Sequence, residues 1–348
     1  MRRRAIAYAL LSAVLFGAST PFAKILVGEV APVILAGLLY LGSGLGLLGW
    51  LVLRKLTSPE PRSPIGRRDL PWLGGAIACG GIIGPALLMS GLVHTEGATA
   101  SLMLNLEAVF TALIAWVVFR ENVDRRVFLG MVAIVAGGMV LSWQQAPSAA
   151  GLTGPLLIAG ACLAWALDNN LTRRVSGGDA VTLAGLKGLI AGLANVGIGL
   201  AYGATLPSAG SIGAAGALGL LGYGISLVLF IVALRDLGSA RTGAYFSVAP
   251  FFGAALALGV LGEHAGPGFW IAAALMAVGV WLHLTERHEH HHVHEPTTHA
   301  HEHMHDEHHQ HGHDFEWDGR EPHSHTHRHG RLRHRHPHYP DLHHRHSH

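Results

Sequence analysis

Histidine dominates the last 64 residues of the chain, which hold 24 of its 27 histidines. They alternate with other residues, as in HEHHHVHE and HSHTHRHG. Neutral imidazole binds Zn, Ni, Cu and Co, and an alternating His-x-His pattern on a flexible chain lets several rings surround one ion. We therefore predict that this tail binds a divalent transition metal. The predicted ligands are His290, His291, His292, His294, His299, His301, His303, His305, His308, His309, His311, His313, His323, His325, His327, His329, His334, His336 and His338.

The role of that metal stays open at this point. The tail has few apolar residues, so we expect it to be disordered until something binds. It could deliver metal to a membrane pathway, sense metal and regulate the protein, buffer metal, or respond to pH. We favour buffering or regulation, because the apolar part of the chain has no convergent His, Cys and Asp pattern. His94 and His264, each close to an acidic residue, form a weaker second candidate for a metal site.

A second set of reactive side chains lies inside apolar segments, where an ionisable group is costly and is therefore a hypothesis for a functional site. Glu107 lies about ten residues into an apolar segment, with Asn105 two residues before it. Such a carboxyl could take up a proton or bind a cationic substrate. The alternative is a protonated carboxyl that bonds a neighbouring helix.

A polar run interrupts the apolar segment that ends in WALDNNLTRR. Asp168, Asn169 and Asn170 are adjacent, so they cover more than half of a helix circumference and at least one must face a cavity or another helix. Lys187 enters the next segment at a similar depth. We expect Asp168 and Lys187 to pair, as a structural lock or as a gate, because pairing reduces the cost of burying each charge. The aromatic candidates for lining a pathway are Trp165 and Tyr245.

Membrane-spanning helices must position these groups. Half of the residues are hydrophobic and only 13% are charged, against about 25% in soluble domains. Apolar stretches of about 20 residues recur, and each is long enough to cross a bilayer as a helix that satisfies its own backbone hydrogen bonds. The sequence predicts an all-α integral membrane protein with ten spans, near residues 5–27, 32–53, 70–92, 97–119, 126–143, 153–173, 181–202, 212–234, 238–261 and 265–284.

Basic residues predict the orientation of these spans. With the N-terminus inside, the cytoplasmic segments collect fifteen Arg and Lys residues and the opposite loops carry none. Only Lys24 and Lys187 fall inside spans, and Lys24 is expected to extend to water at the outer end of its helix. The positive-inside rule therefore predicts a protein of the cytoplasmic membrane with both termini in the cytoplasm.

The chain repeats itself with an offset of 142 residues. This offset aligns GATASLMLNLEAVFTALIAWVVFRE (97–121) with SARTGAYFSVAPFFGAALALGVLGE (239–263), so that Phe110 matches Phe252 and Glu121 matches Glu263. Each half holds five spans, and an odd number places the halves in opposite orientations, as in secondary transporters. We predict a first repeat at 1–146, a second at 147–284 and a histidine-rich tail at 285–348. Paired glycines within spans allow close helix packing, and a homodimer stays open.

The first span's FGASTPFAK and the two copies of the fourth-span block resemble the EamA-type transporters of the drug/metabolite transporter superfamily. The resemblance covers about residues 5–283. It implies a ten-helix bundle of two inverted five-helix repeats that moves small solutes by alternating access. The second copy has Pro250 where the first has Ala108, a departure that makes the centre of the fourth span unusual.

These patterns favour a secondary transporter of a small solute with a metal-binding tail that regulates or buffers. The alternative is an exporter of Zn, Ni or Co that the tail supplies. A purely sensory membrane protein would not need a carboxyl in mid-membrane. We expect no enzymatic activity, because the apolar part of the chain has no HExxH pattern and no clear nucleophile–base pair, and no ATP-driven pumping, because no GxxxxGK[ST] loop is present. We also expect no required cofactor and no nucleic-acid partner.

Overall fold

The computed structural model describes residues 2–57, 69–119, 125–145, 149–175, 179–237, 242 and 245–285, and the backbone of four strands between 289 and 337. The chain divides into two units, a helical unit over residues 1–286 and a second unit over 287–348.

The described residues of the first unit form ten helical segments, as the sequence predicted. Their bounds are α1 Arg2–Val27, α2 Pro32–Thr57, α3 Leu70–Ala76 with η1 Ile77–Ile83 and α4 Gly84–His94, α5 Gly97–Met103 with α6 Leu106–Phe119, α7 Arg125–Gln145, α8 Thr153–Val175, α9 Ala180–Ala201, α10 Ala209–Gly219 with η3 Leu220–Ile225 and α11 Ser226–Leu237, α13 Ala249–Val260, and α14 Pro267–Leu284. A short 3-10 turn, η2 Ala149–Leu152, precedes α8. The start of the ninth predicted span lies partly outside the described residues.

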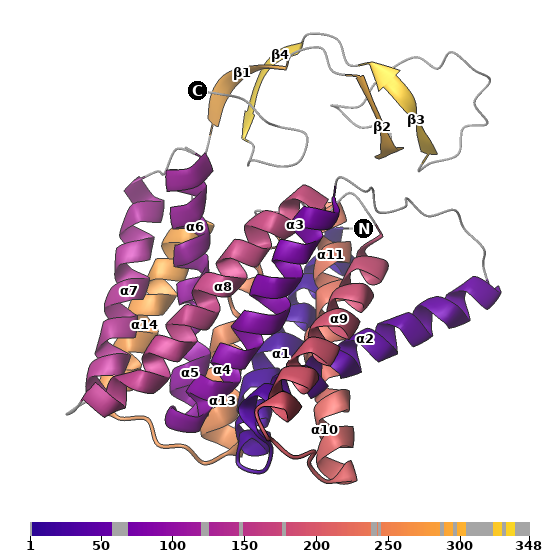
Figure 1. Ribbon diagram of the computed structural model, residues 1–348. Helices are drawn as coiled ribbons and strands as arrows, with labels where there is room; N and C mark the ends of the chain where they lie inside the picture. Colours follow the sequence, from indigo (N-terminus) through magenta and orange to yellow (C-terminus); the bar gives the residue numbers. More distant parts are fainter. Residues whose placement is uncertain are drawn as a thin grey trace. The chain divides into compact units, whose positions relative to one another are not determined.

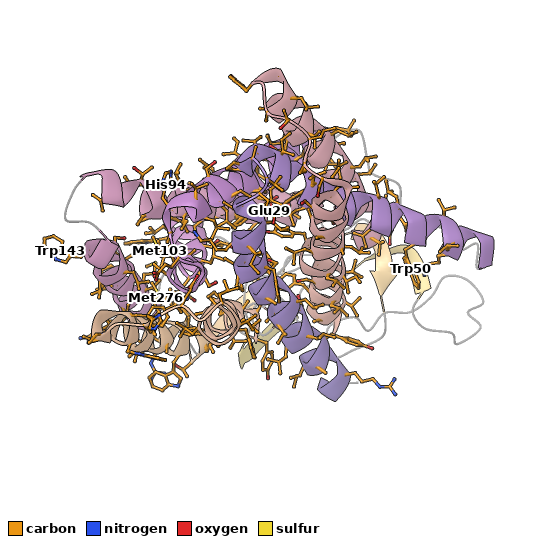
Figure 2. All side chains as sticks on the ribbon, turned by 90° about the horizontal axis from the view of Figure 1, so that it is seen from below. Glu29, Trp50, His94, Met103, Trp143 and Met276 are labelled. Carbon is orange, nitrogen blue, oxygen red and sulfur yellow. The ribbon has the colours of Figure 1, made fainter. Side chains whose placement is uncertain are left out.

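Eight of these helical segments are long and apolar enough to cross a membrane. The helix α13 is shorter, and α8 carries the polar run Asp168–Asn170. Large apolar side chains cover the outer surface, as lipid-facing residues would: Trp143 is 84% exposed. Figure 2 shows Trp143 extending from the edge of the bundle, whereas Met103 and Met276 lie among the helices, where both are buried. The unit is an integral membrane bundle.

The helices pack in pairs that relate the two halves of the chain. The second span of each half packs on the other, α2 on α9, and so does the fifth, α7 on α14 (Figure 1). Likewise α1 packs on α11 and α13, while α8 packs on α4 and α6. Each five-helix half therefore makes the same set of contacts with its counterpart, which is the arrangement of two inverted repeats.

Glycine sets the closest approaches between these helices. A Cβ on Gly188 would lie 2.7 Å from the backbone nitrogen of Gly44, so α2 and α9 touch through their backbones. A Cβ on Gly42 would lie 2.6 Å from the Cα atom of Gly216 in α10. The small residues thus serve packing within the chain, as expected.

Four of the ten segments are interrupted, and the interruptions match between the repeats. The third and eighth spans contain the π-helical segments η1 and η3, and the Gly80 and Gly222 within them are 142 residues apart. The fourth span turns at Leu104 and Asn105, and the ninth turns at Ser247 and Val248. Since π segments and turns release backbone groups from the regular ladder, these positions are where side chains can bond the backbone.

The second unit contains two antiparallel strand pairs. The strands are β1 Glu289–His294, β2 Thr298–His303, β3 His323–Arg328 and β4 Leu332–Pro337. The strand β1 pairs with β4, and β2 pairs with β3. Disorder of this tail in the absence of metal stays a prediction.

Candidate functional site

The carbonyl of Gly80 is the centre of the candidate site. Within η1 the N–H of Gly84 bonds the carbonyl of Cys79, five residues back. In that register the carbonyl of Gly80 would be bonded by residue 85, which is proline and has no N–H. Two side chains bond it instead: the hydroxyl of Tyr40 donates at 2.6 Å and the indole Nε1 of Trp165 at 3.0 Å.

The next carbonyl, of Gly81, is satisfied in a similar way. Residue 85 is also four places after Gly81, so Pro85 removes its regular helical partner too. The Nδ2 of Asn195 donates to this carbonyl at 3.0 Å, and Asn195 is completely buried. The third span is thereby joined to α2, α8 and α9 by hydrogen bonds to its backbone.

An ion pair lies beside this interruption. The Nζ of Lys187 in α9 pairs with the Oδ2 of Asp168 in α8, and both side chains are largely buried, at 14% and 9% exposed. The hydroxyl of Thr172 donates to the other carboxylate oxygen of Asp168 at 2.8 Å. A Cβ on Gly80 would lie 2.6 Å from the Cβ of Asp168, so only glycine leaves room for the pair. The pairing that the sequence predicted is confirmed.

Glu107 approaches the same region from the first turn of α6. Its Oε1 accepts a hydrogen bond from the Nδ2 of Asn169 at 2.7 Å. It interacts electrostatically with Asp168 and with Lys187, which places all four polar side chains in one neighbourhood. We call Glu107, Asp168, Asn169 and Lys187 the central polar cluster.

Aromatic rings adjoin this cluster. Phe16 packs edge-on against Trp165 and Tyr223, with ring centroids 6.3 Å and 5.8 Å away, and Tyr40 lies 5.5 Å from Tyr223. Trp165 and Tyr40, which donate hydrogen bonds to the Gly80 carbonyl, therefore belong to a group of four packed rings with Phe16 and Tyr223. Such rings bind an apolar body and attract cations to their faces.

The charges of the central polar cluster define its chemistry. It holds two carboxyls and one ammonium, so its fully ionised form is negative by one charge. Asp168 is buried and Glu107 and Lys187 are half-buried, so a site with that charge is completed by a proton or by a cation. It can therefore receive an amine-bearing solute, a proton, or each in turn.

The other predicted pathway residues are placed differently. Asn105 is buried at the turn between α5 and α6, where its Nδ2 donates to the carbonyl of Leu102 at 2.9 Å. Asn170 donates to the carbonyl of Ala166 at 2.8 Å within its own helix. Tyr245 packs against the small cluster of Ala5, Ala9 and Ala233, near the start of α1. The structure does not bring Tyr245 to the central polar cluster.

Sequence reasoning missed several residues of the site. Phe16, Tyr40 and Tyr223 look like ordinary apolar-helix residues, and only their contacts show that they belong together. Asn195 could have been found, because a polar amide inside an apolar span is itself a signal. Gly80 and Gly81, five and four residues before Pro85, were a second signal that the sequence offered.

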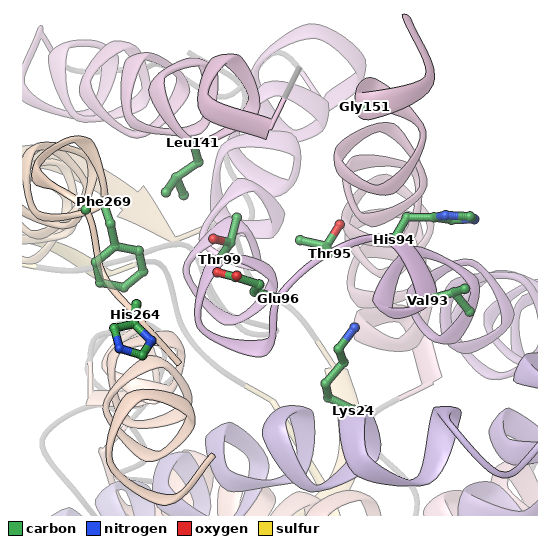
Figure 3. A pocket seen from close by; sticks show the side chains of 11 residues that line it. Lys24, Val93, His94, Thr95, Glu96, Thr99, Leu141, Gly151, His264 and Phe269 are labelled. Carbon is green, nitrogen blue, oxygen red and sulfur yellow. The ribbon is translucent and has the colours of Figure 1, made fainter. Parts of the chain in front are cut away.

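We call the side of the bundle where α1 ends and α5 begins the far side. A cavity of about 520 Å³ opens there (Figure 3). Among the residues that line it are Lys24, His94, Glu96, Thr99 and His264. The Nζ of Lys24 donates to the carbonyl of Leu92 at 2.5 Å, so this lysine bonds the backbone at the cavity.

The structure describes only some of the residues that were predicted to bind metal. Among the residues whose side chains the structure describes, no group of three or more His, Cys, Asp or Glu residues could hold a metal ion. His94 and His264 line the far-side cavity without such a group. Twelve of the predicted tail ligands lie on the strands, where only the backbone is described. The others lie outside the described residues: His305, His308, His309, His311, His313, His329 and His338.

Glu263 joins the two repeats at the far side. Its carboxylate accepts hydrogen bonds from the backbone N–H groups of Gly97 and Ala98, at 2.8 Å and 2.7 Å. These are the first amides of α5, which have no partner inside the helix. The residue at the cap position itself, Glu96, makes no capping bond. The second repeat thus caps the fourth span of the first.

Comparisons with known proteins agree with this architecture. A model of the EamA-like transporter family matches residues 3–143 and 152–285, one match for each repeat. A protein of Methanothermobacter thermautotrophicus described as an uncharacterized transporter is 29% identical over 284 residues, covering 77% of this chain and 82% of that protein. A probable 4-amino-4-deoxy-L-arabinose-phosphoundecaprenol flippase subunit ArnE of Klebsiella pneumoniae is 36% identical over 103 residues, covering 30% of this chain and 91% of that protein.

A solved crystal structure shows the same fold. It is 20% identical to this chain, with a TM-score of 0.60, and the match covers 79% of this chain and 95% of that one.

Proposed function

The chain belongs to the EamA-like transporter family, and on that premise we propose that it carries a small amine-bearing organic solute across the membrane by alternating access. The observation that carries the proposal is the central polar cluster, a site with one unbalanced negative charge beside four aromatic rings. An ammonium group balances that charge, and the rings accept the apolar remainder of the solute.

Glu107 is the proposed binding carboxyl. Asp168 is already engaged by Lys187 and Thr172, whereas Glu107 has the hydrogen bond from Asn169. A neutral amide does not balance the charge of an ionised carboxyl, so the ionised form of Glu107 can bind the ammonium group of a ligand. The same carboxyl would exchange a solute ammonium for a proton, which would couple transport to a proton gradient.

In the proposed cycle, the two inverted repeats move against each other to open the site to either side of the membrane. The repeats meet at the far side through the bond of Glu263 to α5, and the interruptions of the third, fourth, eighth and ninth spans lie at matching positions. Broken helices around a central site are typical of transporters in which one repeat moves against the other. The positive-inside rule supports assigning the far side to the outside of a cytoplasmic membrane, with both termini inside.

The tail is proposed to bind divalent metal and to regulate or buffer, rather than to supply cargo. Within the part of the helical unit that the structure describes, the polar site contains carboxyl, amide and ammonium groups and no cluster of metal ligands. Histidine is confined to the tail apart from His94, His264 and His283. A metal exporter would need ligands along its pathway.

Ligand-induced thermal stabilisation tests both parts of the proposal, because a ligand that binds the folded state raises its apparent melting temperature. Purified full-length protein and a shortened chain that ends at Arg287 are screened against Zn²⁺, Ni²⁺, Co²⁺ and a panel of amines, amino acids and nucleosides. We expect amine-bearing solutes to stabilise both chains and metals to act only on the full-length protein. Stabilisation of the shortened chain by a metal alone would instead make metal the cargo.

Glu107→Gln identifies the binding group. The substitution keeps the size and the hydrogen bond with Asn169 but removes the charge, so affinity for the stabilising solute should fall by about tenfold or more. Glu29→Gln is the matched control, since Glu29 bonds Ser211 at the far side and lies outside the cluster. Equal affinities of the two variants would remove Glu107 from the site.

A further inference from the structure

The strand register of the tail places histidine opposite histidine. In β2 and β3 the paired positions are His299 with His327, His301 with His325, and His303 with His323. These three pairs occupy alternate positions on both strands and therefore share one face of the ladder. The other face carries no histidine: its pairs are Thr298 with Arg328, Ala300 with Thr326, and Glu302 with Ser324.

The strands β1 and β4 repeat this arrangement. Here the histidine pairs are His290 with His336 and His292 with His334. The alternate positions pair His291 with Arg335 and Val293 with Arg333, so the positive charges are confined to the opposite face. A cation is therefore favoured on one face and disfavoured on the other.

The register, and not composition alone, creates these pairs. A slip by one residue in either direction would leave no histidine of β2 opposite a histidine of β3, because side chains alternate between faces with a period of two. Both strand pairs nevertheless have their histidines in the same phase. A sequence that only needed a high density of imidazole would not require this phase.

The spacing suits a metal ion. Directly opposed residues of an antiparallel pair have Cβ atoms about 5 Å apart, and the next pair on the same face lies about 7 Å along the strand. Four histidines at the corners of such a rectangle can converge on one ion, to which each ring nitrogen binds at about 2 Å. Zn²⁺ and Co²⁺ accept four such ligands.

We propose that each strand pair is a binding site for one divalent transition-metal ion, with the four imidazoles supplied by two neighbouring histidine pairs. This deepens the proposed metal-binding role of the tail and rests on it. In β1–β4 the two available pairs form one site. In β2–β3 the middle pair, His301 with His325, is shared by both possible sites, so that ladder holds one ion at a time.

The middle pair gives the inference a sharp test. Its removal leaves the two end pairs of β2–β3 about 13 Å apart, which is too far for one ion to join them. Removal of an end pair, His303 with His323, takes away the same number of histidines from the same strands. It leaves two neighbouring pairs, and so it leaves the site.

The experiment uses the full-length protein in detergent. Bound Co²⁺ is followed by its visible absorption, and Zn²⁺ by competition with a chromophoric chelator. The His301→Ala/His325→Ala variant should lose one of two tightly bound ions, or bind it at least about tenfold more weakly. The His303→Ala/His323→Ala variant should retain both ions. Asn substitutions at the same positions serve as a second version that keeps the strands polar.

The outcomes separate the inference from the proposal on which it rests. Equal losses in the middle-pair and end-pair variants would overturn the paired sites and leave a tail that binds metal without order. A full-length protein that binds no more metal than the chain ending at Arg287 would overturn both the sites and the metal-binding role of the tail.

Discussion

Breaking the pair between Asp168 and Lys187 should destabilise the bundle far more than an exposed ion pair would. Removing one partner leaves the other as an uncompensated buried charge, which typically costs about 3–5 kcal/mol, whereas an exposed pair contributes about 0–1 kcal/mol. The two side chains are only 14% and 9% exposed, so the larger range applies. Asp168 also accepts from Thr172, and Asp168→Asn would weaken that bond as well.

The expected result is a double-mutant cycle with strong coupling. Asp168→Asn and Lys187→Met should each lower the apparent melting temperature by on the order of 10 °C. The double variant should recover most of that loss, because neither charge is then left alone. Asp179→Asn is the control: it makes the same chemical change at the N-cap of α9, where Asn also caps well.

Thermal unfolding in detergent and solute uptake by proteoliposomes, measured on the same variants, distinguish a lock from a gate. A lock predicts that the double variant recovers both stability and uptake. A gate predicts recovered stability with uptake still lost. Single variants that melt within a few degrees of the Asp179→Asn control would refute the reasoning, because the pair would then behave as a solvated one.

Two further perturbations test the interruption and the junction of the repeats. Gly80→Ala should lower the free energy of unfolding by about 1–3 kcal/mol, because the new Cβ would overlap Asp168. The control is Gly74→Ala, at a helix glycine with open space around it, which should be neutral or stabilising. The melting temperatures of the two variants are compared. Glu263→Ala removes two hydrogen bonds to the first amides of α5 and should lower the free energy of unfolding by about 1 kcal/mol. Glu96→Ala, at the cap position, removes no such bond and should lower it by less. Equal melting temperatures for the two glutamate variants would contradict the capping role of Glu263.

Hydropathy and charge predicted most of the fold, because membrane spans are set by length and apolarity. Nine of the ten segments begin and end within a few residues of the predicted bounds, and the start of the ninth lies partly outside the described residues. The pairing of Asp168 with Lys187 was also predictable, since both residues lie in consecutive antiparallel spans at similar depth. A buried charge in an apolar helix leaves few choices of partner.

The interruptions were not predictable from hydropathy. A π segment and an α segment of the same composition are equally apolar. The shift from four-residue to five-residue hydrogen bonds therefore does not change the mean hydropathy. Pro85 lies inside this span and frees a backbone carbonyl, but it does not identify the side chains that bond this carbonyl. Tyr40 and Trp165 are recruited from helices that are distant in sequence, and Tyr245, which looked equivalent, packs elsewhere.

The two repeats share their interruptions but differ in the side chains that bond them, and this difference supports the proposed place of the solute site. In the first repeat, η1 is followed by Pro85, and its free carbonyls bind Tyr40, Trp165 and Asn195. In the second, Ser226 directly follows η3, and it exchanges hydrogen bonds with Ser12 without any charged group. Matching interruptions would give both halves the same places to bend in the proposed alternating-access cycle. Among the described residues, the ion pair of Asp168 and Lys187 lies beside η1 and has no counterpart beside η3, so the proposed solute site lies beside the third span and not beside the eighth.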